Sequence, residues 1–143
     1  MSSIPSSALA SRPVEAQRAT LLAAIGAWNI AVPYLATAIG LDVNVESIVE
    51  VVDHVVPGVI VVAAALYLRT LARRRSLAGQ STALIASGVA FLAGFWVLAT
   101  HVPLWGDAAD SAVSWEAAIW HSVASLPIVA LAVWFVVRSI PEP

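Results

Sequence analysis

Three histidines and several carboxylates are the side chains of this sequence with the most distinctive chemistry. The histidines are His54, His101 and His121, and Asp53 and Glu116 lie close in sequence to two of them. Neutral imidazole ligates zinc or copper, and two histidines on different helices can hold a haem iron. A histidine–carboxylate cluster can instead pass protons. Three hypotheses follow: a haem or transition-metal site, a proton or ion pathway, and histidines that only hydrogen-bond within the fold.

Sequence motifs support no other chemistry. The chain has no cysteine, which excludes disulfides, thiol redox chemistry and Cys-ligated metal centres. It has no lysine for a Schiff base, no H-E-x-x-H, no G-x-x-x-x-G-K-S/T phosphate loop and no G-x-S-x-G nucleophile elbow. A net charge of −2 leaves no basic face for nucleic acid. We therefore expect neither an enzyme of these classes nor a nucleic-acid partner.

Hydropathy places the histidines in a membrane. Hydrophobic residues make up 60% of the 143 residues and charged residues 11%, whereas a soluble domain is roughly half apolar and one quarter charged. Four apolar segments lie at about 19–40, 48–68, 82–104 and 115–137. Each has the ~20 residues that span ~30 Å of hydrocarbon. The sequence predicts an all-α membrane protein, a four-transmembrane-helix bundle in a lipid bilayer.

Charge predicts the orientation of the four spans. The seven basic residues all fall on one side of them: Arg12, Arg18, Arg69, Arg73, Arg74, Arg75 and Arg138. Short arginine-rich connections stay cytoplasmic, so we expect a multi-pass plasma-membrane protein with both termini inside. Residues 1–17 lack a periodic apolar face and are expected to be a disordered cytoplasmic tail before a membrane domain at 18–143. Ala36-Thr37-Ala38 resembles a signal-peptide cleavage site, but the apolar stretch before it is too long, so we expect the first span to be retained.

The chain carries an internal repeat. Gly26 and Trp28 in the first span recur as Gly94 and Trp96 in the third, an offset of 94 − 26 = 68. Pro33 and Pro103 follow them near the outer ends, while His54 and His121 in the second and fourth spans are offset by 121 − 54 = 67. This pattern predicts two parallel helical hairpins, at about 19–68 and 82–138, related by a pseudo-two-fold axis along the membrane normal.

Gly26-x-Trp28 followed by Val32-Pro33-Tyr34 resembles the SPW-repeat family of small integral membrane proteins. That family carries Ser-Pro-Trp in the first of two transmembrane helices per repeat, and the resemblance covers residues 19–138. Ser-Pro-Trp reads Val-Pro-Tyr here and becomes Val102-Pro103-Leu104-Trp105 in the second repeat. The resemblance implies the architecture and adds little on function. We expect a non-catalytic scaffold or partner subunit without a cofactor, acting in a homo-oligomer or a larger complex; the alternatives are haem or metal binding and a small proton-coupled carrier.

Distance along the helices predicts where the polar residues lie. His54 precedes Arg69 by 15 residues and His121 precedes Arg138 by 17, or about 22 and 25 Å, which places both in the outer third of the bilayer. His101 should lie at the outer interface as a solvated side chain. The carboxylates also have structural explanations, since Ser47–Glu50 is a capping box. Ser114 is a predicted N-cap, after which Glu116 favours the helix dipole.

Small residues and prolines predict how the spans pack. Ridges of small side chains at Ala23, Ala27 and Ala31, and at Ala86, Ala90 and Gly94, are expected to be the seams between helices. Pro57 removes a helix hydrogen bond and frees the carbonyl of Asp53, which a neighbour or water must then satisfy.

Overall fold

The computed structural model describes residues 6–40, 47–73 and 79–140, and these are helical or in turns, with no strand among them. The helices are α1 (Ser6–Ala38), α2 (Ser47–Glu50), a π-helical turn η1 (Val51–Val55), α3 (Val56–Arg73), α4 (Gly79–Ala109), α5 (Trp115–Ser122) and α6 (Ser125–Ser139). Four helical stretches, 14–38, 48–72, 81–109 and 115–139, are long and apolar enough to cross a membrane. The predicted all-helical fold with four such spans is confirmed.

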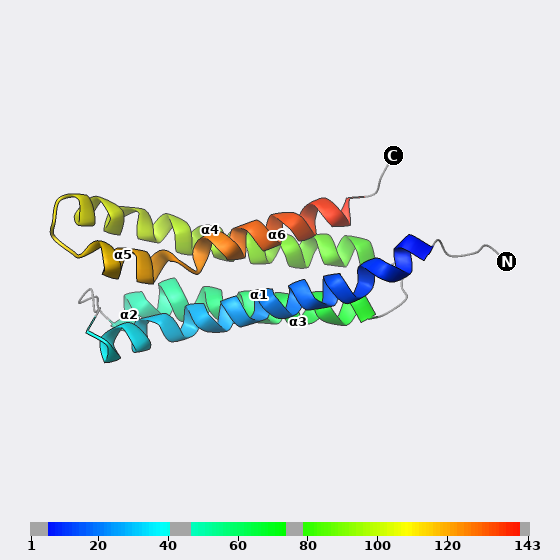
Figure 1. Cartoon of the computed structure of the whole chain (residues 1–143), viewed down its shortest axis with the longest axis horizontal. Helices are drawn as coiled ribbons and strands as arrows, with labels where there is room; N and C mark the ends of the chain where they lie inside the picture. Colours follow the sequence, from blue (N-terminus) through cyan, green and yellow to red (C-terminus); the bar gives the residue numbers. More distant parts are fainter. Residues whose placement is uncertain (1–5, 41–46, 74–78, 141–143) are drawn as a thin grey trace.

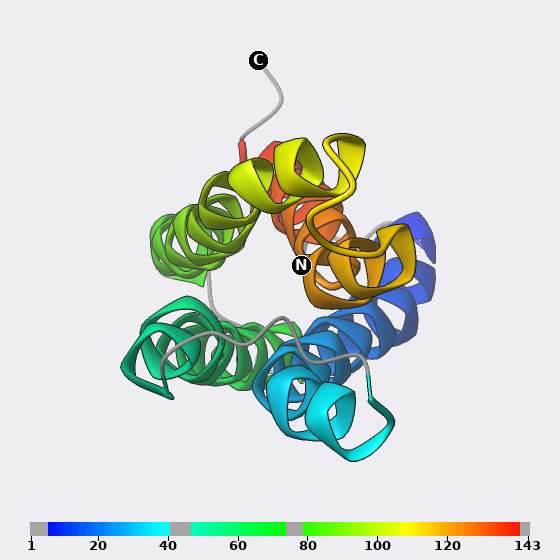
Figure 2. The same cartoon turned by 90° about the vertical axis from the view of Figure 1, so that its left-hand side faces the viewer.

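The helices form an elongated bundle of two hairpins (Figure 1). In the first hairpin α1 packs along α3, and in the second α4 packs along α6. Seen along the bundle, α3 lies between α1 and α4, and α6 with α5 closes the ring beside α1 (Figure 2). The connections therefore place η1, the end of α4 and α5 together at one end of the bundle.

Two helix boundaries differ from the predictions. Helix α1 begins at Ser6, so residues 6–17, expected to be a disordered tail, are helical; their alanines are the strongest helix formers. Residues 1–5 of the expected tail lie outside the described residues. Helix α4 continues past residue 104 to Ala109 and carries Pro103 inside it. A proline removes a single helix hydrogen bond, which kinks a helix without necessarily ending it.

Glycines set the closest contacts within each hairpin. A Cβ at Gly26 of α1 would lie 2.9 Å from the Val61 side chain of α3. A Cβ at Gly94 of α4 would lie 2.5 Å from the Ile128 side chain of α6. Both distances are shorter than a carbon–carbon contact allows, so each hairpin needs a glycine at its crossing.

The two predicted ridges of small residues differ in how far they are buried between helices. Ala86, Ala90 and Gly94 of α4 are buried, as the small-residue ridge predicts. On α1 the ridge is buried only in part. Ala27 is exposed and Ala23 and Ala31 are half-buried, whereas the fully buried face carries Leu22, Gly26, Asn29 and Val32. That face holds an amide that lipid cannot satisfy, so burying Asn29 against η1 outweighs burying small alanines.

The other repeat-motif residues lie on two sides of the bundle. Trp28 of α1 packs edge-to-face on Trp120 of α5, with ring centroids 5.2 Å apart. Trp96 of α4 is half exposed and lines an apolar groove between α3 and α4 together with Pro57. Pro33 is buried, whereas Pro103 is exposed.

The core changes character along the bundle. Towards the arginine-bearing end it is a continuous apolar cluster that includes Leu22, Val61, Leu68, Ile128 and Phe135. The opposite end buries His54, His101 and His121. The exposed apolar side chains that cover the outside of the bundle, such as Ile85 and Leu92 at 65% exposure each, are compatible with contact to lipid.

Candidate functional site

The three histidines meet at one end of the bundle. His54 comes from η1, His101 from α4 and His121 from α5, and their exposed fractions are 2%, 6% and 2%. His54 Nε2 lies 3.1 Å from His101 Nε2, and the His54 and His121 ring centroids are 5.9 Å apart. The prediction that they converge is confirmed, and His101, expected to be solvated, is buried with the other two.

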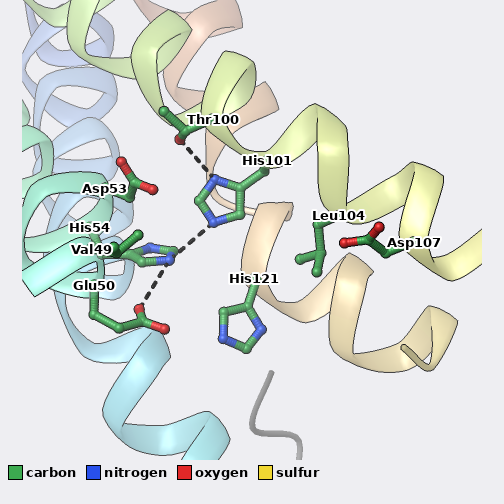
Figure 3. A pocket seen from close by; sticks show the side chains of 9 residues that line it. All are labelled: Val49, Glu50, Asp53, His54, Thr100, His101, Leu104, Asp107 and His121. Carbon is green, nitrogen blue, oxygen red and sulfur yellow. Dashed lines mark hydrogen bonds and ion pairs between the residues drawn. The ribbon is translucent and has the colours of Figure 1, made fainter. Parts of the chain in front are cut away.

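These rings face a cavity of about 140 Å³, which we call the histidine cavity (Figure 3). Its lining comprises Val49, Glu50, Asp53, His54, Thr100, His101, Leu104, Asp107 and His121. Glu50 Oε2 lies 3.5 Å from His54 Nε2. The cavity therefore gathers imidazole nitrogens and carboxylate oxygens around one partly open space.

Backbone carbonyls fix the proton positions on two of the rings. His101 Nδ1 lies 2.7 Å from the carbonyl oxygen of Val97, and His121 Nδ1 lies 3.0 Å from that of Ala117. A carbonyl only accepts, so both Nδ1 atoms donate and the Nε2 atom of each neutral ring carries a lone pair. His54 Nε2–H then donates to His101 Nε2. In metal sites generally, a hydrogen bond from one ring nitrogen to a backbone carbonyl orients the imidazole so that its other nitrogen ligates the metal.

Pro57 explains why His54 lies in a π-helical turn. The proline nitrogen carries no hydrogen, so it cannot bond the carbonyl oxygen of Asp53. The preceding turn is wider than an α-helical turn, and Val56 N–H donates to the carbonyl oxygen of Val51, five residues back. Single π-turns of this kind recur at functional sites. Helix α5 is interrupted in a corresponding place, one residue after His121, before α6 resumes at Ser125.

Asn29 ties α1 to this turn. Its Nδ2 donates to the carbonyl oxygen of His54 at 2.9 Å, and the side chain is fully buried. Asn29 Oδ1 and His54 Nδ1 are also buried, and neither has a hydrogen-bond partner among the described residues. Buried polar atoms without partners are uncommon, and they mark the surroundings of His54 as adapted to something beyond packing.

Replacing Asn29 with leucine should lower the free energy of unfolding by roughly 1–3 kcal/mol, because the carbonyl of His54 loses its donor inside the bundle. Denaturation of the purified protein in detergent micelles, followed by circular dichroism, measures the change. The control is Thr20→Ala, which removes an exposed hydroxyl bonded within its own helix. Equal stability of the two variants would contradict a structural role for the Asn29 amide.

The other predicted site residues separate into two groups. Asp53 lines the histidine cavity, as expected. Glu116 does not line it and is exposed. It precedes His121 by five residues, which turns it about 140° away around α5. Ser114 caps α5 by accepting from Ala117 N–H at 3.1 Å, as predicted. The Ser47 side chain of the predicted capping box lies outside the described residues.

The sequence reasoning missed Thr100, Leu104 and Asp107, which line the cavity from α4. Their spacing of four and three residues is that of one helix face, so a signal was present. Asp107 lies beyond residue 104, where the third apolar segment is predicted to end, whereas α4 extends to Ala109.

Within the described part of the chain, no group of three or more His, Cys, Asp or Glu side chains is placed so that it could hold a metal ion. The histidines are instead bonded to one another and to carbonyls. No protein family, curated protein or solved structure compared with the chain matches it. Function must therefore be inferred from the cavity itself.

Proposed function

We propose that this chain is a multi-pass membrane protein that binds one divalent transition-metal ion in the histidine cavity. The observation that carries the proposal is the burial of three imidazoles from three separate elements beside Glu50. Ionisable groups are costly in a membrane and are usually retained there for function. A histidine pair that served only to join helices would not need a third ring and a carboxylate.

The distance between two ring nitrogens supports an ion in this position. His54 Nε2 and His101 Nε2 are 3.1 Å apart. Two metal–nitrogen bonds of ~2.05 Å at angles of 90–110° span roughly 2.9–3.4 Å. The separation of the two nitrogens therefore suits an ion placed to one side of the line between them, and each ring would turn to direct its nitrogen lone pair at the ion. The unpartnered Nδ1 of His54 is free to take up the proton that Nε2 gives up.

The other ligands would complete the site by side-chain rotation. His121 Nδ1–H already donates to the carbonyl oxygen of Ala117, which leaves Nε2 of the same ring to ligate a metal. The Glu50 carboxylate lies beside His54, with its Oε2 3.5 Å from His54 Nε2. Nitrogen and oxygen donors without cysteine, in a chain whose one methionine is Met1, suit Zn(II), Ni(II), Co(II) or Cu(II) rather than Cu(I).

The size of the cavity favours an ion over haem. Organic ligands occupy pockets of about 300–1,000 Å³, whereas the histidine cavity measures about 140 Å³. The proton-coupled carrier has less support. Among the described residues, the core towards the arginine end is apolar apart from Ser87, whose hydroxyl donates to the carbonyl oxygen of Ala83 in its own helix.

We further propose the two-hairpin repeat of the SPW-repeat family, with both termini cytoplasmic. The glycine contacts support it: Gly26 faces Val61 and Gly94 faces Ile128, pairs offset by 94 − 26 = 68 and 128 − 61 = 67. Arg18, Arg69 and Arg138 support the orientation, since they belong to the span ends that the positive-inside rule keeps cytoplasmic.

Metal titration tests the proposal. Protein in detergent, stripped with a chelator, should bind about one Co(II), Zn(II) or Ni(II) per chain, and Co(II) should give visible absorption bands of nitrogen and oxygen coordination. The protein as purified should show no Soret band. A preparation that stays below about one tenth of a metal per chain and colourless with Co(II) would contradict metal binding. That result, together with co-purification in a larger complex, is what the scaffold hypothesis predicts.

A further inference from the structure

Two arginines gather around one tryptophan at the end of the bundle opposite the histidine cavity. The guanidinium carbon of Arg18, on α1, lies 4.0 Å from the centroid of the Trp134 ring of α6. Arg138, one helical turn after Trp134, lies 5.8 Å from the same centroid. The N-terminal half of α1 and the C-terminal end of α6 lie at the same end of the bundle (Figure 1). The first and last spans therefore bring two cations to one aromatic ring.

No carboxylate balances these two cations in the ranges that the structure describes. The ion pair found there, between Glu50 and His54, belongs to the other end of the bundle. Glu15 precedes Arg18 by three residues and makes no ion pair with it within 4 Å. Stacking on the indole holds the guanidinium groups in place, but like charges drawn to one ring repel each other. An anion that contacted both guanidinium groups would offset that repulsion.

The position of the ring identifies the class of anion. Trp134 is part of an apolar stretch long enough to span a membrane and lies four residues before Arg138. Tryptophans near the ends of spans lie at headgroup level. Guanidinium groups match phosphate oxygens in pairs, and basic groups placed between spans at this level bind anionic lipid headgroups.

We propose that Arg18, Trp134 and Arg138 form a binding site for the headgroup phosphate of an anionic phospholipid. Arg18 is half-buried against the ring and Arg138 is exposed, so the Arg18 guanidinium is held by the indole while the Arg138 guanidinium is accessible to a headgroup. The lipid would join α1 to α6, the two spans that are furthest apart in the sequence. The proposal depends on the chain's lying in a bilayer and is independent of metal binding.

Native mass spectrometry of the protein in detergent tests this site. With phosphatidylglycerol added, the chain should retain one lipid at a concentration at which phosphatidylcholine is not retained. Arg18→Gln and Arg138→Gln should each weaken that retention by about fivefold. The matched control is Arg69→Gln, which removes the same charge from α3 without a contact to Trp134 and should leave retention unchanged.

Three results would overturn the proposal. Equal retention of phosphatidylglycerol and phosphatidylcholine would show that no anionic group is selected. Equal losses in all three glutamine variants would show a general charge effect instead of a site. Binding of inorganic phosphate with the same dependence on Arg18 and Arg138 would assign the site to free phosphate. Because Arg138 is exposed, Arg138→Gln should fold normally, and Arg138→Lys should restore part of the binding by restoring the charge.

Discussion

Replacing Gly58 with alanine should lower the free energy of unfolding by about 1–3 kcal/mol, the usual cost of forcing an extra carbon into a packed interface. A Cβ at this position would lie 2.5 Å from Ile30 Cγ1 and 2.9 Å from the backbone oxygen of Gly26. The side chain of Ile30 can rotate, but a backbone oxygen moves only with its helix. The substitution must therefore push α3 away from α1.

Gly88 provides a matched control, because a Cβ there meets no atom within 4 Å. Gly88→Ala should raise the free energy of unfolding by about 0.5–1 kcal/mol, since alanine has the higher helix propensity. The two substitutions are chemically identical and are predicted to have opposite signs. Denaturation in detergent micelles, followed by circular dichroism, measures both. If Gly58→Ala also stabilised the protein, α1 and α3 would not approach as closely as the structure has them.

Replacing His54 with alanine should have the largest effect on metal binding. His54 is the residue whose Nε2 lies near both His101 Nε2 and Glu50 Oε2, and whose ring also packs on His121. Its loss should weaken Co(II) or Zn(II) binding by more than the roughly 10- to 100-fold that loss of an outer-shell partner costs. Titration of chelator-treated protein, monitored by the Co(II) absorption bands, measures the change.

Two further variants serve as controls for the result with His54→Ala. Glu116→Gln removes a carboxylate that is exposed and does not line the histidine cavity, so its affinity should equal that of the wild type. His101→Gln keeps a polar side chain in the core and should also lose affinity, which guards against a folding defect in His54→Ala. If both histidine variants bound metal as tightly as the wild type, the histidine cavity would not be the metal site.

The spans were predictable from sequence because they rest on composition and length alone. Twenty apolar residues need no knowledge of their neighbours to be recognised as a membrane-spanning helix. The convergence of His54 and His121 was predictable for a related reason, because depth follows from counting residues to the flanking arginines. Both inferences use distance along a helix, which the sequence fixes.

The environment of His101 and Glu116 was not predictable in the same way. Burial of His101 depends on which side of α4 faces η1, and so on how the two hairpins meet. Glu116 lies five residues before His121, but on the exposed side of α5. The buried face of α1 was misread for the same reason: periodicity shows which residues share a face, and only tertiary packing decides which face is covered. Rotation about the helix axis is therefore what the sequence leaves open.

The apolar cluster that fills the arginine-bearing half of the bundle has a consequence for how the histidine cavity is used. Among the described residues, Leu22, Val61 and Ile128 belong to an apolar core that lies between the cavity and the opposite end. A solute bound in the cavity would therefore enter and leave at the end of the bundle that carries the cavity. Ligand binding at such a site would not require a solute to pass through the bundle.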